Sequence, residues 1–317
     1  MLRRTKQQVK SAGCHSDERS RGDAQRDFVM TTFHDLYWTA ADGLSLHARD
    51  YPGGGSAAPV ICLHGLTRNA KDFEDLAPAI ADRTGRRVLA VDVRGRGGSA
   101  RAADPASYNP GVYAMDVLAL LDDQKIDCAA FIGTSMGGLI MMTLAALRPA
   151  ALAAAVLNDV GPEIAAEGLA RIRGYVGAPA DTPDWPAAAA YVKAGNQAVF
   201  PHYDDAAWAR MARRTFRDDG GRPVLDYDPG IAAPIRAADP AAPAPDLWPF
   251  FAALVTGRPA LLIRGETSDI LNDDIAGRMR AAAPDMDYAV VPGVGHAPML
   301  DEPAAEAAIL TLLSRAP

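Results

Sequence analysis

Short apolar runs that end abruptly at glycine or at polar residues recur along most of the chain. Near the start, two alternating runs, DLYWTA and LSLHARDY, are joined by Ala41-Asp42-Gly43, which is typical of a β-hairpin. The later runs are apolar throughout, as expected of strands that are buried on both faces. They lie at residues 59–64, 86–93, 128–133, 151–160, 259–264 and 287–292. The pattern therefore predicts eight strands.

Segments with apolar residues at helical spacing lie between these strands. They cover residues 72–83, 111–123, 139–149 and 302–314. Strands that alternate with helices predict an α/β fold, in which a mostly parallel eight-stranded sheet carries helices on both faces.

The pattern changes between residues 162 and 247, where alanines, prolines, charges and scattered aromatic residues replace the strands and no β-like run of useful length occurs. We predict a helical cap inserted after the sixth strand, with the Pro/Ala-rich stretch 231–246 as the return linker. The cap would divide the core into two parts, 30–161 and 248–317. Residues 1–29 are polar and charged without helical periodicity, and we expect them to form a disordered leader.

Composition narrows the possible partners of the chain. Its 317 residues are 49% hydrophobic and carry a formal net charge of -7, which disfavours nucleic acid and an anionic membrane surface. No run approaches the roughly 20 apolar residues of a membrane span, and the leader lacks the apolar core of a secretion signal. Three cysteines form no disulfide framework, so we expect a cytoplasmic protein. The pattern does not indicate an oligomeric state.

A candidate nucleophile lies in the sequence Gly133-Thr134-Ser135-Met136-Gly137, which follows a predicted strand and precedes a predicted helix. Glycines flank a serine in such a turn because the chain is strained and crowded there. This position would expose Ser135 at the carboxyl edge of the sheet. The backbone N–H of Met136 would point at the same spot from the helix N-terminus, as one donor of an oxyanion hole.

Serine needs a base to remove its proton, and a base needs an acid to orient it. His296 follows the last strand in VVPGVGHAPML, where glycines let the loop curl over the edge of the sheet. Asp269, after the seventh strand, is the acid we predict, in the order Ser, Asp, His. Asp159, after the sixth strand, is the alternative, because an acid there can reach the same histidine.

The loop His64-Gly65-Leu66-Thr67 follows the third strand, and we predict that the Leu66 N–H is the second oxyanion donor. His64 is a candidate for ordering this turn or for touching substrate. No His, Cys or carboxylate cluster has metal-ligand spacing, and DVRGRGGS lacks the spacing of a phosphate-binding loop. We therefore expect no metal, nucleotide or other cofactor.

The motifs HGLT, DVRGRGGS, GTSMGG, the late SD and GVGH together resemble the α/β-hydrolase family with a single helical cap, from about Asp35 to the C-terminus. Family members that hydrolyse epoxides or haloalkanes carry aspartate at the position of Ser135. Members that cleave carbon–carbon bonds usually have a longer glycine-rich oxyanion loop. The resemblance thus implies a serine esterase or lactonase acting on a small ester through an acyl-enzyme.

Two other functions stay open on the same residues: a cofactor-free C–C hydrolase or perhydrolase, and a non-catalytic ligand receptor of the same fold. In the catalytic case, we expect the cap to line the substrate pocket with aromatic side chains. The candidates are Trp185, Tyr191, Phe200 and Trp208.

Overall fold

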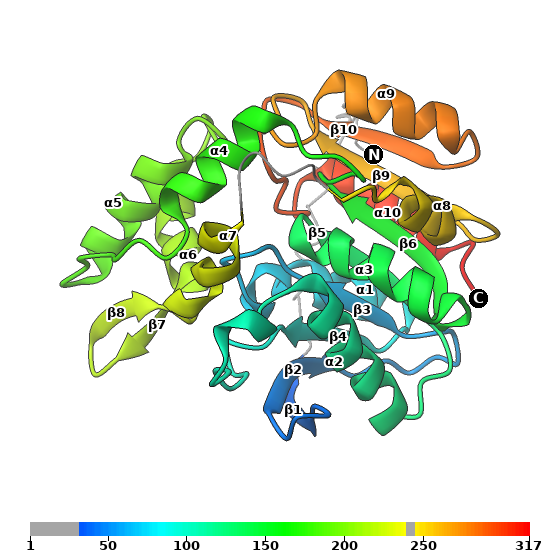
Figure 1. Ribbon diagram of the computed structural model, residues 1–317, viewed down its shortest axis with the longest axis horizontal. Coiled ribbons are helices and arrows are strands. Elements are labelled where there is room, and N and C mark those ends of the chain that lie inside the picture. The colour runs from blue at the N-terminus through cyan, green and yellow to red at the C-terminus, as the bar shows by residue number, and fades with distance from the viewer. Residues whose placement is uncertain (1–31, 239–244) are drawn as a thin grey trace, which may run out of the picture. The chain divides into compact units, whose positions relative to one another are not determined.

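The computed structural model describes residues 32–238 and 245–317 of the chain. The predicted leader, residues 1–29, lies outside the described residues, as does part of the predicted return linker. The described chain from Thr32 onward belongs to one compact unit, in which a central sheet and its covering helices are followed by a smaller, mainly helical cap (Figure 1).

Eight strands form the central sheet in the order β1-β2-β4-β3-β5-β6-β9-β10. Strand β2 runs antiparallel to both β1 and β4, and all other neighbours are parallel. The predicted fold class, a mostly parallel eight-stranded α/β sheet, is confirmed. The strands are β1 (His34–Thr39), β2 (Ser45–Tyr51), β3 (Val60–Leu63), β4 (Val88–Asp92), β5 (Ala129–Thr134), β6 (Leu152–Asn158), β9 (Ala260–Gly265) and β10 (Asp287–Val291).

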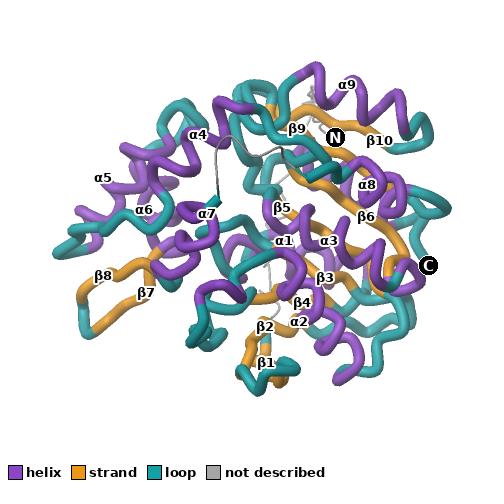
Figure 2. The backbone as a smooth tube through the Cα atoms, viewed as in Figure 1, coloured by secondary structure: helices purple, strands orange, loops and turns teal. Residues whose placement is uncertain are grey.

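Helices cover both faces of the sheet because successive side chains of its buried strands point to opposite faces. In β3, Ile61 and Leu63 join an apolar cluster with α2, α3, α8 and α9, whereas Val60 and Cys62 join one with α1 and α10 (Figures 1 and 2). These helices are α1 (Leu76–Thr84), α2 (Pro110–Asp123), α3 (Met136–Leu147), α8 (Trp248–Val255), α9 (Asp273–Ala282) and α10 (Pro303–Leu313), with short 3-10 turns η1 (Ala70–Phe73), η2 (Pro105–Ser107) and η3 (Pro149–Ala151).

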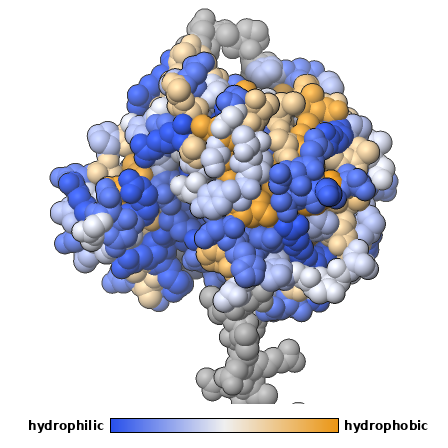
Figure 3. All heavy atoms as spheres, turned by 90° about the horizontal axis from the view of Figure 1, so that it is seen from below, coloured by the Kyte–Doolittle hydropathy of each residue, from blue (hydrophilic) through white to orange (hydrophobic). Residues whose placement is uncertain are grey.

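The cap lies between β6 and α8. It lies at the left in Figure 1, and its surface at the left of Figure 3 is mainly hydrophilic. Its elements are α4 (Ala166–Tyr175), α5 (Trp185–Asn196), α6 (Asp205–Thr215), β7 (Phe216–Asp219), β8 (Arg222–Leu225), the 3-10 turn η4 (Pro229–Ala232) and α7 (Ala233–Ala237). The second half of η4 and all of α7 fall within the stretch 231–246 that was predicted as a linker.

The expectation that the cap contains no strand was wrong, because β7 and β8 pair as an antiparallel hairpin. Their charged sequences, FRDD and RPVL, hide the alternation that marks a half-buried strand. Gly220 and Gly221 form the turn, both with positive φ (63° and 92°), and this two-glycine turn was the available signal.

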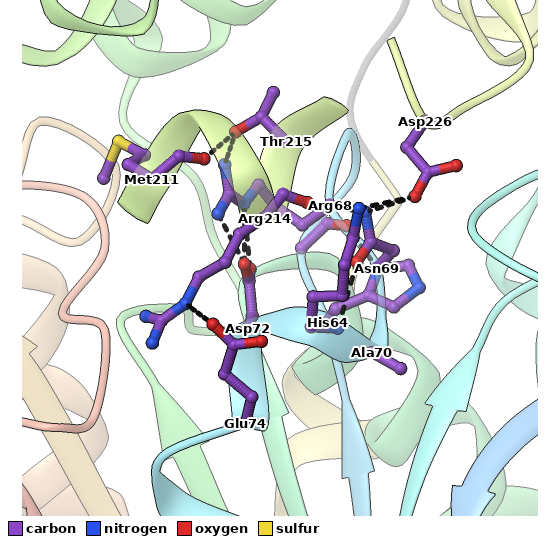
Figure 4. Close-up of polar contacts among 12 residues, drawn as sticks. His64, Arg68, Asn69, Ala70, Asp72, Glu74, Met211, Arg214, Thr215 and Asp226 are labelled. Atoms are coloured by element: carbon purple, nitrogen blue, oxygen red, sulfur yellow. Dashed lines mark hydrogen bonds and ion pairs between the residues drawn. The ribbon is translucent and has the colours of Figure 1, made fainter. Parts of the chain in front are cut away.

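Polar contacts fasten one side of the cap to the core (Figure 4). Arg214, in the last turn of α6, donates from Nε to Glu74 (2.8 Å) and from Nη2 to Asp75 (2.5 Å). The Asn69 side chain donates to the carbonyl of Arg214 (2.9 Å), and Lys71 pairs with Asp226 after β8 (2.8 Å). The end of α6 is therefore bound to the segment that follows β3.

A buried ion pair holds the carboxyl end of β4. Asp92 accepts the N–H groups of Ala70 (2.6 Å) and Gly98 (2.9 Å), and its Oδ2 lies 2.7 Å from His47 Nδ1. His47 Nε2 lies 2.9 Å from Asp35. Burial disfavours the charged imidazole, but the hydrogen bonds with Asp92 and Asp35 outweigh it and raise the pKa of His47 above its ordinary value. Protonated His47 thus stabilises this corner of the sheet.

This raised pKa predicts a pH-dependent stability. The contribution of His47 is fully present below its unfolded pKa, near 6.5, and is lost as the pH rises through the higher folded pKa. We expect His47→Gln to lower the free energy of unfolding at pH 6 by about 1–3 kcal/mol, and by less at pH 9. Urea unfolding at both pH values measures this, with His34→Gln in exposed β1 as the control. If His47→Gln lowered the free energy of unfolding more at pH 9 than at pH 6, the result would contradict the ion pair.

Candidate active site

Three side chains from separate loops meet at the carboxyl edge of the sheet. His296 Nε2 lies 2.9 Å from Ser135 Oγ, and His296 Nδ1 lies 2.8 Å from Asp159 Oδ2. Ser135 stands between β5 and α3, Asp159 follows β6, and His296 follows β10. The strand order places β6 beside β5, so the loops that carry Ser135 and Asp159 are neighbours. The structure thus brings Ser135 and His296 together, as the sequence indicated.

The turn at Ser135 is strained and closely packed. Its φ of 52° and ψ of -113° lie where L-residues are rarely found. A Cβ on Gly137 would lie 2.1 Å from the carbonyl oxygen of Leu63, and one on Gly133 would lie 2.6 Å from the backbone of Gly137. The two glycines therefore let α3 approach β3 and β5 closely enough to hold Ser135 at the edge.

Asp159 is fully buried and its carboxylate is held on both oxygens. Oδ1 accepts the Gly265 N–H (2.8 Å), and Oδ2 accepts the Ser268 hydroxyl (2.7 Å) besides facing His296. Its backbone has a φ of 57°, a conformation that aspartate tolerates better than most residues. The surrounding loops thus fix both the position of the carboxylate and the ring that it faces.

The structure contradicts the prediction that Asp269 orients His296, because the Asp269 side chain is bonded to a different partner. Asp269 binds the guanidinium of Arg171, from Nε to Oδ2 (2.6 Å) and from Nη2 to Oδ1 (2.8 Å). The alternative acid, Asp159, occupies the place beside His296. Arg171 belongs to α4 in the cap, which approaches the β9–α9 loop so closely that a Cβ on Gly168 would lie 2.5 Å from the Asp269 carbonyl. The Asp269 carboxylate is therefore hydrogen-bonded to the cap, while the Asp159 carboxylate is the one bonded to the histidine.

The loop after β3 passes beside the serine. A Cβ on Gly65 would lie 3.8 Å from the Cβ of Ser135. The Gly65 carbonyl is held by His64 Nδ1 (2.7 Å) and by the Arg68 N–H (3.2 Å). Because N–H and C=O point in opposite directions across a trans peptide, these two bonds also fix the direction of the Leu66 N–H.

His64 lies behind this loop and is fully buried. Its Nε2 accepts the Val93 N–H (3.1 Å), so its proton is on Nδ1, which donates to Gly65. Burial lowers the pKa of His64 to about 4, and the ring is neutral near pH 7. It is not among the described residues that line the cavity over Ser135, and its hydrogen bonds are those of a residue that orders the turn.

A second buried side chain, that of Arg96, contacts the two residues whose N–H groups are the candidate oxyanion donors. It is 1% exposed, although it lies in the glycine-rich DVRGRGGS loop. Its Nε donates to the Leu66 carbonyl (3.0 Å), and its Nη2 lies 3.6 Å from the sulfur of Met136, the first residue of α3. The sequence pattern of this loop did not predict a role for Arg96, because the contacts of Arg96 join residues far apart in the chain.

A cavity of about 580 Å³ opens over Ser135 and His296, between the cap and the core. Of the four aromatic residues predicted to line it, Tyr191 and Phe200 do so. Trp185 and Trp208 are not among the described lining residues, and for them the prediction was wrong. Trp208 is buried against Tyr203 inside the cap, and Arg213 stacks on Trp185.

Two other kinds of site are absent from the described residues. No group of three or more His, Cys, Asp or Glu side chains in this part of the chain is placed to hold a metal ion. Within the same ranges, no helix is both long and apolar enough to cross a membrane.

Comparison with known proteins places this site in a family. Residues 58–303 match the family described as alpha/beta hydrolase fold. The chain is 34% identical over 269 residues to 3-hydroxybutyrate-oligomer hydrolase of Cupriavidus necator, which covers 82% of this chain and 90% of that protein. It is 31% identical over 257 residues to an esterase of Mycobacterium tuberculosis, covering 80% of this chain and 81% of that one.

A solved structure agrees with these relatives. An alpha/beta hydrolase from Novosphingobium aromaticivorans has 49% sequence identity and a TM-score of 0.84, over 90% of this chain and 99% of its own. The fold of this chain is thus that of a solved alpha/beta hydrolase. The chain belongs to the α/β-hydrolase family.

The close packing of the turn at Ser135 predicts that substituting alanine for glycine has opposite effects on stability at two positions. Gly137→Ala forces a Cβ into the Leu63 carbonyl, and we expect it to lower the free energy of unfolding by about 1–3 kcal/mol or more. Gly277→Ala in α9 meets no atom within 4 Å and should raise it by about 0.5–1 kcal/mol. Denaturant unfolding measures both, and equal effects of the two substitutions would refute the packing argument.

Proposed function

We propose that this chain is a serine hydrolase that cleaves a carboxylic ester or lactone through an acyl-enzyme intermediate. The observation that carries the proposal is the unbroken hydrogen-bonded relay from Ser135 through His296 to Asp159. A relay of this kind matters because a serine hydroxyl is a weak nucleophile until a positioned base accepts its proton.

Each member of the relay has one role in the proposed reaction. Ser135 Oγ attacks the ester carbonyl while His296 Nε2 accepts the proton from the hydroxyl. His296 then gives this proton to the departing alcohol, and an ester links the acyl group to Ser135. Water, activated by His296, releases the acid and restores the serine. Asp159 remains ionised throughout, keeps the proton of the neutral imidazole on Nδ1 and stabilises the imidazolium that forms.

The negative oxygen of the tetrahedral intermediate needs donors that are already in place. We assign this role to the N–H groups of Leu66 and Met136. His64 acts as a positioning residue, because it holds the carbonyl of the Gly65–Leu66 peptide. Arg96 adds a buried positive charge that contacts both donor residues, and a charge in such a dry environment stabilises an oxyanion more strongly than in water.

The size of the cavity and the names of the relatives support a small ester substrate. A volume of about 580 Å³ lies within the usual range for small-molecule sites, and Tyr191, Phe200 and Met211 give it apolar walls. One relative is named an esterase, and another is named for 3-hydroxybutyrate oligomers, which are chains of hydroxy-acid esters. We extend the proposal to short oligoesters of this kind, with the cap determining which chains fit.

Removing the nucleophile is the first test. Ser135→Ala should lower kcat on p-nitrophenyl butyrate by roughly three orders of magnitude or more, because the relay acts as one unit. The measurement is p-nitrophenolate release at 405 nm, with Ser107→Ala in an exposed turn as the control. A ligand receptor would show no turnover in the wild type, and a Ser135→Ala variant that retains wild-type kcat would end the assignment.

A pair of aspartates tests the orienting acid. Asp159→Asn should lower kcat about 1,000-fold or more, since an amide facing Nδ1 favours the wrong tautomer of His296. Asp269→Asn should change kcat on the same neutral ester by less than about tenfold, because it weakens only a partly exposed ion pair. Melting temperatures confirm that both variants fold. The reverse order of severity would transfer the role to Asp269.

A further inference from the structure

Two guanidinium groups line the cavity over Ser135, and they differ in how their donors are used. Arg68 donates from Nε and Nη2 to Asp72 and from Nη1 to the Thr215 hydroxyl (2.6 Å; Figure 4). Asp72 and Thr215 line the same cavity. The charge of Arg68 is thus balanced within the cavity wall, and all of its nitrogen atoms have partners.

Arg171 is placed differently. Its Nε and Nη2 bind Asp269 side-on, and no acceptor among the described residues is hydrogen-bonded to Nη1. Arg171 lines the cavity, whereas Asp269 is not among the described residues that do. The side chain of Arg171 is 34% exposed and lines the cavity, so a ligand in the cavity can reach it. Asp269 therefore holds the guanidinium from outside the cavity wall and leaves one pair of N–H groups available.

From this arrangement we infer that Arg171 binds a free carboxylate on the substrate, so that the preferred ester is an anionic one. The inference deepens the proposed hydrolase function and rests on it. A guanidinium matches a carboxylate in shape and charge. Because Asp269 already offsets part of the charge of Arg171, a singly charged carboxylate suits the site better than a doubly charged phosphate. A short hydroxy-acid oligoester ends in such a carboxylate.

The bond between Arg171 and Asp269 also explains why the guanidinium is preorganised. Two parallel N–H···O bonds fix the plane of the group before substrate arrives, which reduces the side-chain entropy lost on binding. The backbone of α4 is also held close to the loop that carries Asp269, because Gly168 in the first part of α4 packs directly on Ile270 and Asp269. Arg171 is in this respect a substrate-binding residue on a rigid helix and takes no part in proton transfer.

The test compares two substrates of nearly equal shape. The linear dimer of 3-hydroxybutyrate carries a terminal carboxylate at pH 7.5, and its terminal carboxamide is neutral. We expect the wild-type enzyme to favour the carboxylate in kcat/KM by roughly 10- to 100-fold, mainly through KM. Arg171→Gln should remove this preference, because kcat/KM should fall much further on the carboxylate than on the carboxamide. Product is measured by liquid chromatography.

Arg173→Gln is the matched control, because it removes the same charge from an exposed position on the same helix. It should keep the wild-type preference. Arg171→Lys, which keeps the charge without the planar fork, should retain part of it. A second measurement needs no variant: 3-hydroxybutyrate should inhibit the hydrolysis of p-nitrophenyl butyrate more strongly than 3-hydroxybutyramide does.

Two results would overturn the inference. The first is equal kcat/KM of the wild-type enzyme for both dimers together with equal inhibition by the acid and the amide. The second is an Arg171→Gln variant that loses activity on both dimers to the same extent, as expected if Arg171 only fastens α4 to the core. In either case Ser135-dependent hydrolysis of p-nitrophenyl butyrate would leave the proposed function intact, whereas its absence would remove both.

Discussion

A buried carboxylate joins the carboxyl ends of three strands in this structure. Asp159 directly follows β6, accepts the N–H of Gly265 at the end of β9, and faces His296 in the loop after β10. A buried carboxylate is unfavourable unless its oxygens are hydrogen-bonded. The fold therefore satisfies Asp159 only when these loops converge, and the same convergence turns the His296 ring toward Ser135. The stability of the sheet edge and the geometry of the site thus depend on one set of contacts.

The cap depends on a second set of contacts, which also determines the charges of the cavity wall. On one side, Arg214 binds Glu74 and Asp75, and Arg68 bridges Asp72 and Thr215. On the other side, Arg171 binds Asp269. Arg68 and Arg171 each cross between cap and core and also line the cavity over Ser135, whereas Arg214 is not among the described lining residues. The attachment of the cap and the charge of the cavity wall are therefore coupled in this fold.

The sequence predicted what depends on local patterns. Apolar runs revealed the eight strands, and GTSMGG and GVGH placed Ser135 and His296, because crowding at a tight turn demands glycine whatever the distant environment. The choice between Asp159 and Asp269 depended on strand order and on an arginine 98 residues away, neither of which a local pattern contains. The same limit applies to Trp185 and Trp208, since the presence of an aromatic residue in the cap does not distinguish a cavity wall from the interior of the cap.

The central claim is that Ser135 is an activated nucleophile, and covalent labelling tests it most directly. An alkyl fluorophosphonate reacts with a serine only where a base removes the proton and donors stabilise the developing charge. Intact mass and peptide mapping should show one adduct per chain, on the peptide that contains Ser135. An adduct confined to another residue, or a folded chain that forms none, would contradict the account.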